Sequence, residues 1–178
     1  GDGYDVVTPC GVPGRVSWGV PIAEAQIVLD PGHGGDVETG AVGANGLAEK
    51  DLNLTLAKRA ALELETRGIS VVLTRTADYR MPLAVRAQIG NDLDAAAIVS
   101  LHHNGPEAAP SDGPGTEIFV QQASDESRRL GGTIYGAVTA ALGRFDIAWQ
   151  AAPDAGVLAS ARSWPPPWDS RWCSTARA

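Results

Sequence analysis

Two histidines and one glutamate in this sequence have side chains suited to binding a metal ion. His33 lies in Asp30-Pro-Gly-His-Gly-Gly35, His102 lies in Ser100-Leu-His-His-Asn104, and Glu49 opens a stretch with helical patterning. Zinc in a hydrolytic site usually takes three nitrogen or oxygen ligands from the protein and leaves a fourth position for water or substrate. Residue type and spacing therefore indicate a candidate metal site.

Each candidate also has an ordinary alternative role. Histidines at strand ends can form hydrogen bonds without binding a metal, and a glutamate in the first turn of a helix often interacts only with the helix dipole. Neighbouring side chains on a strand point to opposite faces, so His102 and His103 are not both expected to be ligands. The spacing alone leaves metal binding and these alternatives about equally open.

The hydrophobic pattern predicts the elements that must position these residues. Residues 25–30 form a short apolar strand, and the glycines and proline of residues 31–35 predict a turn at its end. Residues 49–67 carry apolar side chains at helical spacing, and Gly68 supplies a left-handed helix end. Residues 69–74 are rich in β-branched side chains and predict a second strand.

A strand, a helix and a strand in this order need a crossover connection, so the two strands should be parallel. The predicted fold class is α/β, with a mostly parallel open sheet flanked by helices. Ligand sites in such folds lie at the carboxyl ends of the strands. His33 and His102 both follow strands, and Glu49 joins them if residues 36–48 fold back. Further predicted elements are a helix at 83–93, a strand at 95–101, a strand at 116–121 and a helix at 130–142.

Five motifs resemble the zinc-dependent N-acetylmuramoyl-L-alanine amidases, the catalytic domains of peptidoglycan amidases. The resemblance runs in the family's order from about Ile27 to about Arg162, and Gly90 replaces an alanine of the family pattern. The matching segments are Asp30-Pro-Gly-His-Gly-Gly35, Glu49-Lys-Asp-Leu-Asn-Leu54, Val71-Val-Leu-Thr-Arg75, Leu83 to Asn91, and Ser100-Leu-His-His-Asn104.

The resemblance implies that Zn²⁺ is bound by His33, Glu49 and His102, with His102 favoured over His103. It implies hydrolysis of the amide bond between N-acetylmuramic acid and L-alanine in peptidoglycan or muropeptides, as in cell wall degradation. We expect a secreted, periplasmic or cell-wall-associated monomer. The family's late catalytic glutamate has no counterpart, since no glutamate follows Glu126, and the catalytic base is unknown. A module that binds zinc and peptidoglycan without turnover is the alternative.

The composition sets the remaining boundaries. The chain has 178 residues and a formal net charge of −7, which disfavours binding to nucleic acid phosphates or anionic lipid. It lacks an apolar run of about 18 residues, so no membrane span is expected. We predict a leader or linker at 1–24, an amidase-like zinc-binding domain at 25–162, and an atypical, poorly ordered tail at 163–178. Cys10 and Cys173 belong to no cysteine cluster and identify no role.

Overall fold

The structure is a computed structural model of the chain that describes residues 3–7, 12–103, 116–121 and 123–142. The described residues fall into two compact units, one ending at residue 103 and one beginning at residue 116. None of the described helices is both long enough and apolar enough to cross a membrane.

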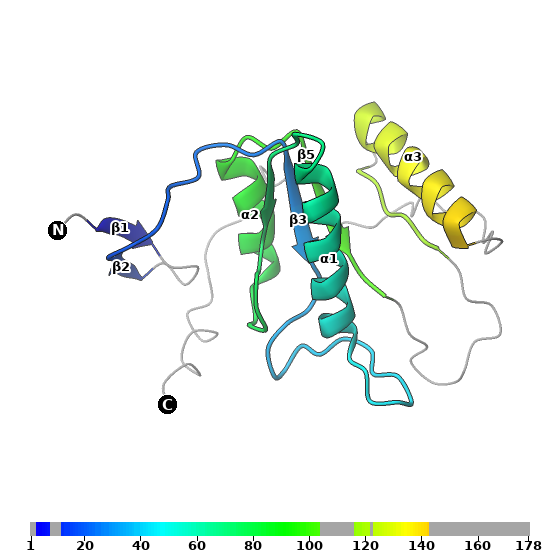
Figure 1. Cartoon of the computed structure of the whole chain (residues 1–178), viewed down its shortest axis with the longest axis horizontal. Coiled ribbons are helices and arrows are strands. Elements are labelled where there is room, and N and C mark those ends of the chain that lie inside the picture. The colour runs from blue at the N-terminus through cyan, green and yellow to red at the C-terminus, as the bar shows by residue number, and fades with distance from the viewer. Residues whose placement is uncertain (1–2, 8–11, 104–115, 122, 143–178) are drawn as a thin grey trace. The chain divides into compact units, whose positions relative to one another are not determined.

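The first unit contains a parallel sheet of three strands in the order β4-β3-β5. Strand β3 (Ile27–Pro31) pairs with β4 (Val71–Leu73) on one side and with β5 (Ala97–Leu101) on the other. Helices α1 (Glu49–Glu65) and α2 (Leu83–Asp92) flank the sheet, and both contact β3 (Figure 1). The predicted α/β class and the parallel strands are confirmed.

The central position of β3 explains its continuous apolar run. A parallel strand covered on both faces has no solvent side, so its residues do not alternate between apolar and polar. Val28 and Leu29 are buried accordingly. The other core side chains are small or apolar residues of the two helices and the adjoining loops, namely Ala25, Ala57, Ala61, Met81 and Val85.

Helix α1 ends through the glycine that the sequence indicated. Gly68 has a φ of 78°, which is in the left-handed region. Its amide donates to the carbonyl of Glu65 at 2.9 Å, and the amide of Ile69 donates to the carbonyl of Leu64 at 3.1 Å. This pair of bonds is the Schellman motif, which satisfies carbonyls that the helix leaves free and turns the chain toward β4.

The second unit contains α3 (Asp125–Leu142). The helix begins before the predicted residue 130, because the Ser124 hydroxyl accepts the Ser127 amide at 3.1 Å and caps the first turn. The prediction of a strand at 116–121 is wrong, since these residues join no ladder among the described residues. Their apolar side chains pack on the helix instead, where Gly131 leaves room for Ile118 and Val120.

A two-stranded antiparallel ribbon lies within the segment predicted as a leader or linker. Strand β1 (Tyr4–Val7) pairs with β2 (Pro13–Val16). Four residues per strand are too few to show a periodicity against the surrounding glycines and prolines, so sequence patterning missed them. The domain boundaries at 1–24, 25–162 and 163–178 stay predictions, and the tail lies outside the described residues.

Candidate metal centre

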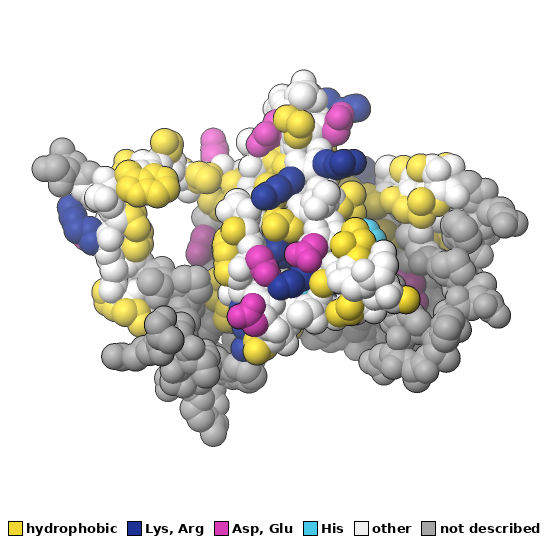
Figure 2. Space-filling view, turned by 60° about the horizontal axis from the view of Figure 1, so that its bottom comes forward, with side chains coloured by type: hydrophobic (Ala, Val, Ile, Leu, Met, Phe, Trp, Pro, Cys, Tyr) yellow, Lys and Arg dark blue, Asp and Glu magenta, His cyan; other side chains and the backbone are white. Residues whose placement is uncertain are grey.

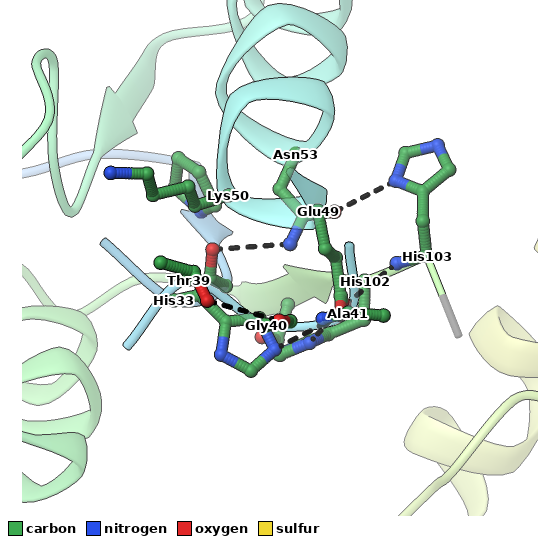
Figure 3. A network of polar contacts seen from close by, with 12 residues as sticks. His33, Thr39, Gly40, Ala41, Glu49, Lys50, Asn53, His102 and His103 are labelled. Carbon is green, nitrogen blue, oxygen red and sulfur yellow. Dashed lines mark hydrogen bonds and ion pairs between the residues drawn. The ribbon is translucent and has the colours of Figure 1, made fainter. Parts of the chain in front are cut away.

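His33, Glu49 and His102 lie together at the carboxyl ends of β3 and β5 (Figure 3). His33 Nε2 is 3.3 Å from Glu49 Oε2, and His102 Nδ1 is 3.0 Å from Glu49 Oε1. The two imidazole rings meet edge to face with centroids 4.7 Å apart. One nitrogen or oxygen atom from each residue lies within 4.8 Å of the others. The structure thus brings all three candidate residues into one group.

The sheet and the 36–48 loop explain why residues so far apart in the sequence meet. The Gly32 amide donates to the Leu101 carbonyl at 3.0 Å, which extends the pairing of β3 with β5 up to the histidines. The loop returns the chain to the same edge, because the Glu49 amide donates to the Ala41 carbonyl at 2.8 Å. The expectation that this loop folds back is confirmed.

The protein environment holds Glu49 in its ionised form. Burial to 6% exposure raises the pKa of its carboxyl, but the bonds it accepts outweigh that effect, and the pKa lies below its ordinary value. The Ala41 amide donates to Oε2 at 2.9 Å and the His103 amide donates to Oε1 at 3.0 Å. The hydrogen bond with His102 and the charge of His33 lower the pKa further. An ionised carboxylate is the form that binds a metal.

Two glycines leave space for these side chains. Gly40 has a φ of 68°, and an added Cβ would lie 2.6 Å from both Glu49 Oε2 and His33 Cδ2. An added Cβ at Gly32 would overlap the imidazole of His102. His33 itself has a φ of 61°, which is uncommon for a residue other than glycine and places its side chain through a strained backbone.

His103 is held away from the group (Figure 3). Its Nδ1 is 2.7 Å from Oδ1 of Asn53, a fully buried residue one turn after Glu49. Asn53 Nδ2 donates to the Gly32 carbonyl at 3.1 Å, so its Oδ1 is the acceptor and His103 Nδ1 carries the proton. His102 therefore faces Glu49, while the side chain of His103 ties β5 to α1.

A buried aspartate organises the strand ends beneath the group. Asp30 accepts bonds from Thr74 Oγ1 at 2.5 Å, from Arg86 Nη1 at 2.7 Å and from Ser100 Oγ at 2.7 Å. These donors come from the ends of β4 and β5 and from α2. Arg86 also donates to the His33 carbonyl at 2.8 Å. The network explains the aspartate that precedes Pro31 in the histidine segment.

Arg75 is the second buried cation and contacts backbone carbonyls. Its Nε donates to Pro31 O at 2.8 Å, and Nη2 donates to Gly32 O at 3.0 Å and to Lys50 O at 2.7 Å. Burial and the nearby charge of Arg86 lower its pKa. Sequence reasoning recognised the motifs containing Asn53, Arg75 and Arg86 but assigned these residues no role. Hydrogen bonds to backbone carbonyls leave no periodic pattern that could have revealed it.

An ion pair beside the group joins Lys50, in the first turn of α1, to Asp78, in the loop after β4. Lys50 Nζ donates to Asp78 Oδ2 at 2.6 Å, and the Gly35 amide donates to Asp78 Oδ1 at 2.7 Å. The hydrogen bond from Lys50 lowers the pKa of Asp78, and the same bond raises the pKa of Lys50. Both residues stay charged at neutral pH, and the pair connects the start of α1 to the loop after β4.

The donor set is of the kind that binds a divalent metal such as zinc. Tetrahedral zinc with ligands at about 2.1 Å separates its donor atoms by roughly 3.4 Å. The two histidine nitrogens lie 3.3 and 3.0 Å from different oxygens of Glu49, and one donor atom from each residue lies within 4.8 Å of the others. The side chains of His33 and His102 are 29% and 43% exposed, so the group opens to solvent. Histidine atoms are visible at the surface in Figure 2, on a face where acidic and basic side chains are interspersed.

Fold and site together define an α/β domain with a metal-type donor group at the carboxyl edge of a parallel sheet. The comparison with protein families identifies it more closely. The chain belongs to the N-acetylmuramoyl-L-alanine amidase family, whose profile matches residues 27–163.

Individual relatives agree with this assignment. The N-acetylmuramoyl-L-alanine amidase AmiA of Escherichia coli is 43% identical over 97 residues, which cover 53% of this chain and 32% of AmiA. LytC of Bacillus subtilis is 34% identical over 126 residues, covering 71% of this chain and 25% of LytC. The chain thus spans a third or less of these relatives.

Solved amidase structures share the fold. AmiC2 of Nostoc punctiforme has a TM-score of 0.58 at 38% identity and covers 64% of this chain and 61% of its own. The catalytic domain of CwlV from Bacillus (Paenibacillus) polymyxa has a TM-score of 0.64 at 29% identity, covering 72% and 70%. Residues 143–178 lie outside the described residues, as does Cys10, so the expectation that the family's late glutamate has no counterpart stays a prediction.

Proposed function

We propose that this chain hydrolyses the amide bond between N-acetylmuramic acid and L-alanine in peptidoglycan, with Zn²⁺ bound by His33, Glu49 and His102. The observation that carries the proposal is the convergence of these three donors at the carboxyl edge of the sheet in a member of the amidase family. When bound, zinc supplies a Lewis acid for the amide carbonyl and lowers the pKa of a water toward roughly 7.

The residues of the chain prepare the site for that chemistry. The amides of Ala41 and His103 keep Glu49 ionised, so that a proton does not compete for its oxygens. Arg86 holds the carbonyl of His33, and Asn53 holds the carbonyl of Gly32. Both contacts hold the loop that carries His33, and Asn53 ties it to α1, the helix that carries Glu49. The loop is therefore fixed before substrate arrives, which reduces the entropy lost on binding.

The substrate also suggests where the protein acts. Peptidoglycan lies outside the cytoplasmic membrane, so the proposal includes an exported protein that works in the periplasm or at the cell wall. Intact peptidoglycan and soluble muropeptides are both proposed substrates.

The test is the release of stem peptides from purified peptidoglycan, measured as new amino-terminal L-alanine. We expect release that a chelator abolishes and added zinc restores, and that Glu49→Gln loses. Glu63→Gln is the matched control, since Glu63 lies exposed on the same helix and should keep activity. A folded, zinc-loaded protein that releases nothing would overturn the proposal and leave the alternative, a module that binds zinc and peptidoglycan without turnover.

A further inference from the structure

Arg75 contacts both the segment that carries His33 and the segment that carries Glu49. The residue follows β4, and its side chain is almost fully buried, with 1% of the residue exposed. Its Nη2 donates both to the carbonyl of Gly32, directly before His33, and to the carbonyl of Lys50, directly after Glu49. One nitrogen therefore links the loop after β3 to the first turn of α1.

Among the described residues, Arg75 is held by backbone carbonyls and not by a carboxylate partner. All four hydrogen bonds that Arg75 forms among the described residues go to backbone carbonyls, those of Pro31, Gly32, Lys50 and Ala77. Burying a charge is costly unless it is well hydrogen-bonded, and charge-assisted bonds are roughly twice as strong as neutral ones. The free-energy cost of burying this guanidinium is thus offset mainly by its hydrogen bonds to the backbone next to His33 and Glu49.

Arg86 provides a contrast within the same network. It also donates to backbone carbonyls, those of Pro31, His33 and Met81, but it pairs with Asp30 and forms no hydrogen bond with α1 among the described residues. It secures the histidine loop to the sheet. Of the two buried arginines, Arg75 alone connects that loop to the start of α1.

We propose that Arg75 is a positioning residue that sets the spacing between His33 and Glu49, so that the affinity of the site for zinc depends on its planar guanidinium. Lysine carries its donors on one nitrogen at the end of a flexible chain and does not reproduce this fork of bonds. The inference rests on the proposed metal centre. Loss of a group that orients metal ligands typically lowers metal affinity by about 10- to 100-fold.

The experiment compares zinc dissociation constants of folded wild type, Arg75→Lys and Arg59→Lys, measured by competition with a chromophoric chelator. Arg59 is an exposed residue of α1 and controls for the same chemical change. We expect Arg75→Lys to bind zinc about 10- to 100-fold more weakly and Arg59→Lys to match wild type. Equal affinities in all three proteins would overturn the role of Arg75. Wild type that binds no zinc would instead overturn the proposed metal centre.

Thermal unfolding with and without zinc separates positioning from general stability. A purely structural role lowers the midpoint of the metal-free protein but leaves the zinc-induced rise unchanged, whereas weaker binding reduces that rise. If Arg75→Lys does not fold, hydrogen exchange of the Arg75 Nε–H in metal-free wild type provides the test. Slow exchange is expected from a preformed contact, and exchange as fast as that of exposed arginines would contradict it.

Discussion

The carboxyl edge of the parallel sheet and the amino-terminal ribbon use polar residues in opposite ways. At the sheet edge, Asp30, Arg75 and Arg86 are buried and each forms several hydrogen bonds. In the ribbon, the ion pair of Asp5 with Arg15 has a bond of 2.6 Å but is 84% and 57% exposed. The same kinds of side chain thus form a dense network in one region and an isolated surface contact in the other.

This difference predicts where substitutions should affect stability and function. A buried donor or acceptor that loses its partner keeps its full desolvation cost, whereas an exposed ion pair is replaced by water. The family match begins at residue 27, after the ribbon, and includes the whole sheet-edge network. Substitutions in the two regions should therefore differ in their effect on the free energy of unfolding.

The largest effect on stability is expected from Arg86→Met. The change leaves the carboxylate of Asp30 without its cation and frees the carbonyl of His33. Breaking a buried pair on one side costs about 3–5 kcal/mol. Urea unfolding followed by circular dichroism measures the loss. A loss below about 1 kcal/mol, the range of exposed pairs, would contradict the distinction between the two regions.

Gly40→Ala should be next in size. Alanine at a left-handed position costs roughly 1–3 kcal/mol, and its Cβ would also overlap Glu49 and His33. Gly46→Ala is the matched control, because Gly46 has a φ of 79° and open space around it. Both variants should lose stability, but only Gly40→Ala should lose zinc affinity in a chelator competition. Equal zinc affinity in the two would show that Gly40 does not shape the site.

Gly90→Ala should have a smaller effect of opposite sign. The glycine lies inside α2, and an added Cβ would make ordinary contacts of 3.6 Å with Ile98. Alanine loses less backbone entropy in a helix, so the free energy of unfolding should rise by about 0.5–1 kcal/mol. Urea unfolding tests this value. A destabilised variant would mean that α2 packs on β5 more tightly than these distances indicate.

The smallest effect is expected in the ribbon itself. Arg15→Gln removes the exposed ion pair with Asp5 and should change the free energy of unfolding by less than about 0.5 kcal/mol. Stem-peptide release should stay at the wild-type rate. A loss comparable to that of Arg86→Met would show that the ribbon contributes to the stability of the first unit.

Periodicity explains which parts of the structure were predictable. The run before Asp30 and the spacing of apolar residues in α1 identify a strand and a helix, and their order requires parallel pairing. His33 and His102 follow as strand-end residues. The hydrogen bonds of Arg75 were not predictable, because a side chain that binds carbonyls distant in the sequence leaves no pattern near its own position. The prediction of a strand at 116–121 failed because its apolar residues pack on α3, a contact that their pattern in the sequence does not reveal.

The most direct test of the account is zinc K-edge X-ray absorption of the chain loaded with one equivalent of zinc. The account predicts two imidazole nitrogens and a carboxylate oxygen at about 2.0–2.2 Å, with one imidazole lost in His33→Ala and one in His102→Ala. A sulfur ligand at about 2.3 Å, which only Cys10, Cys173 or Met81 could provide, or a spectrum unchanged by these substitutions, would contradict it.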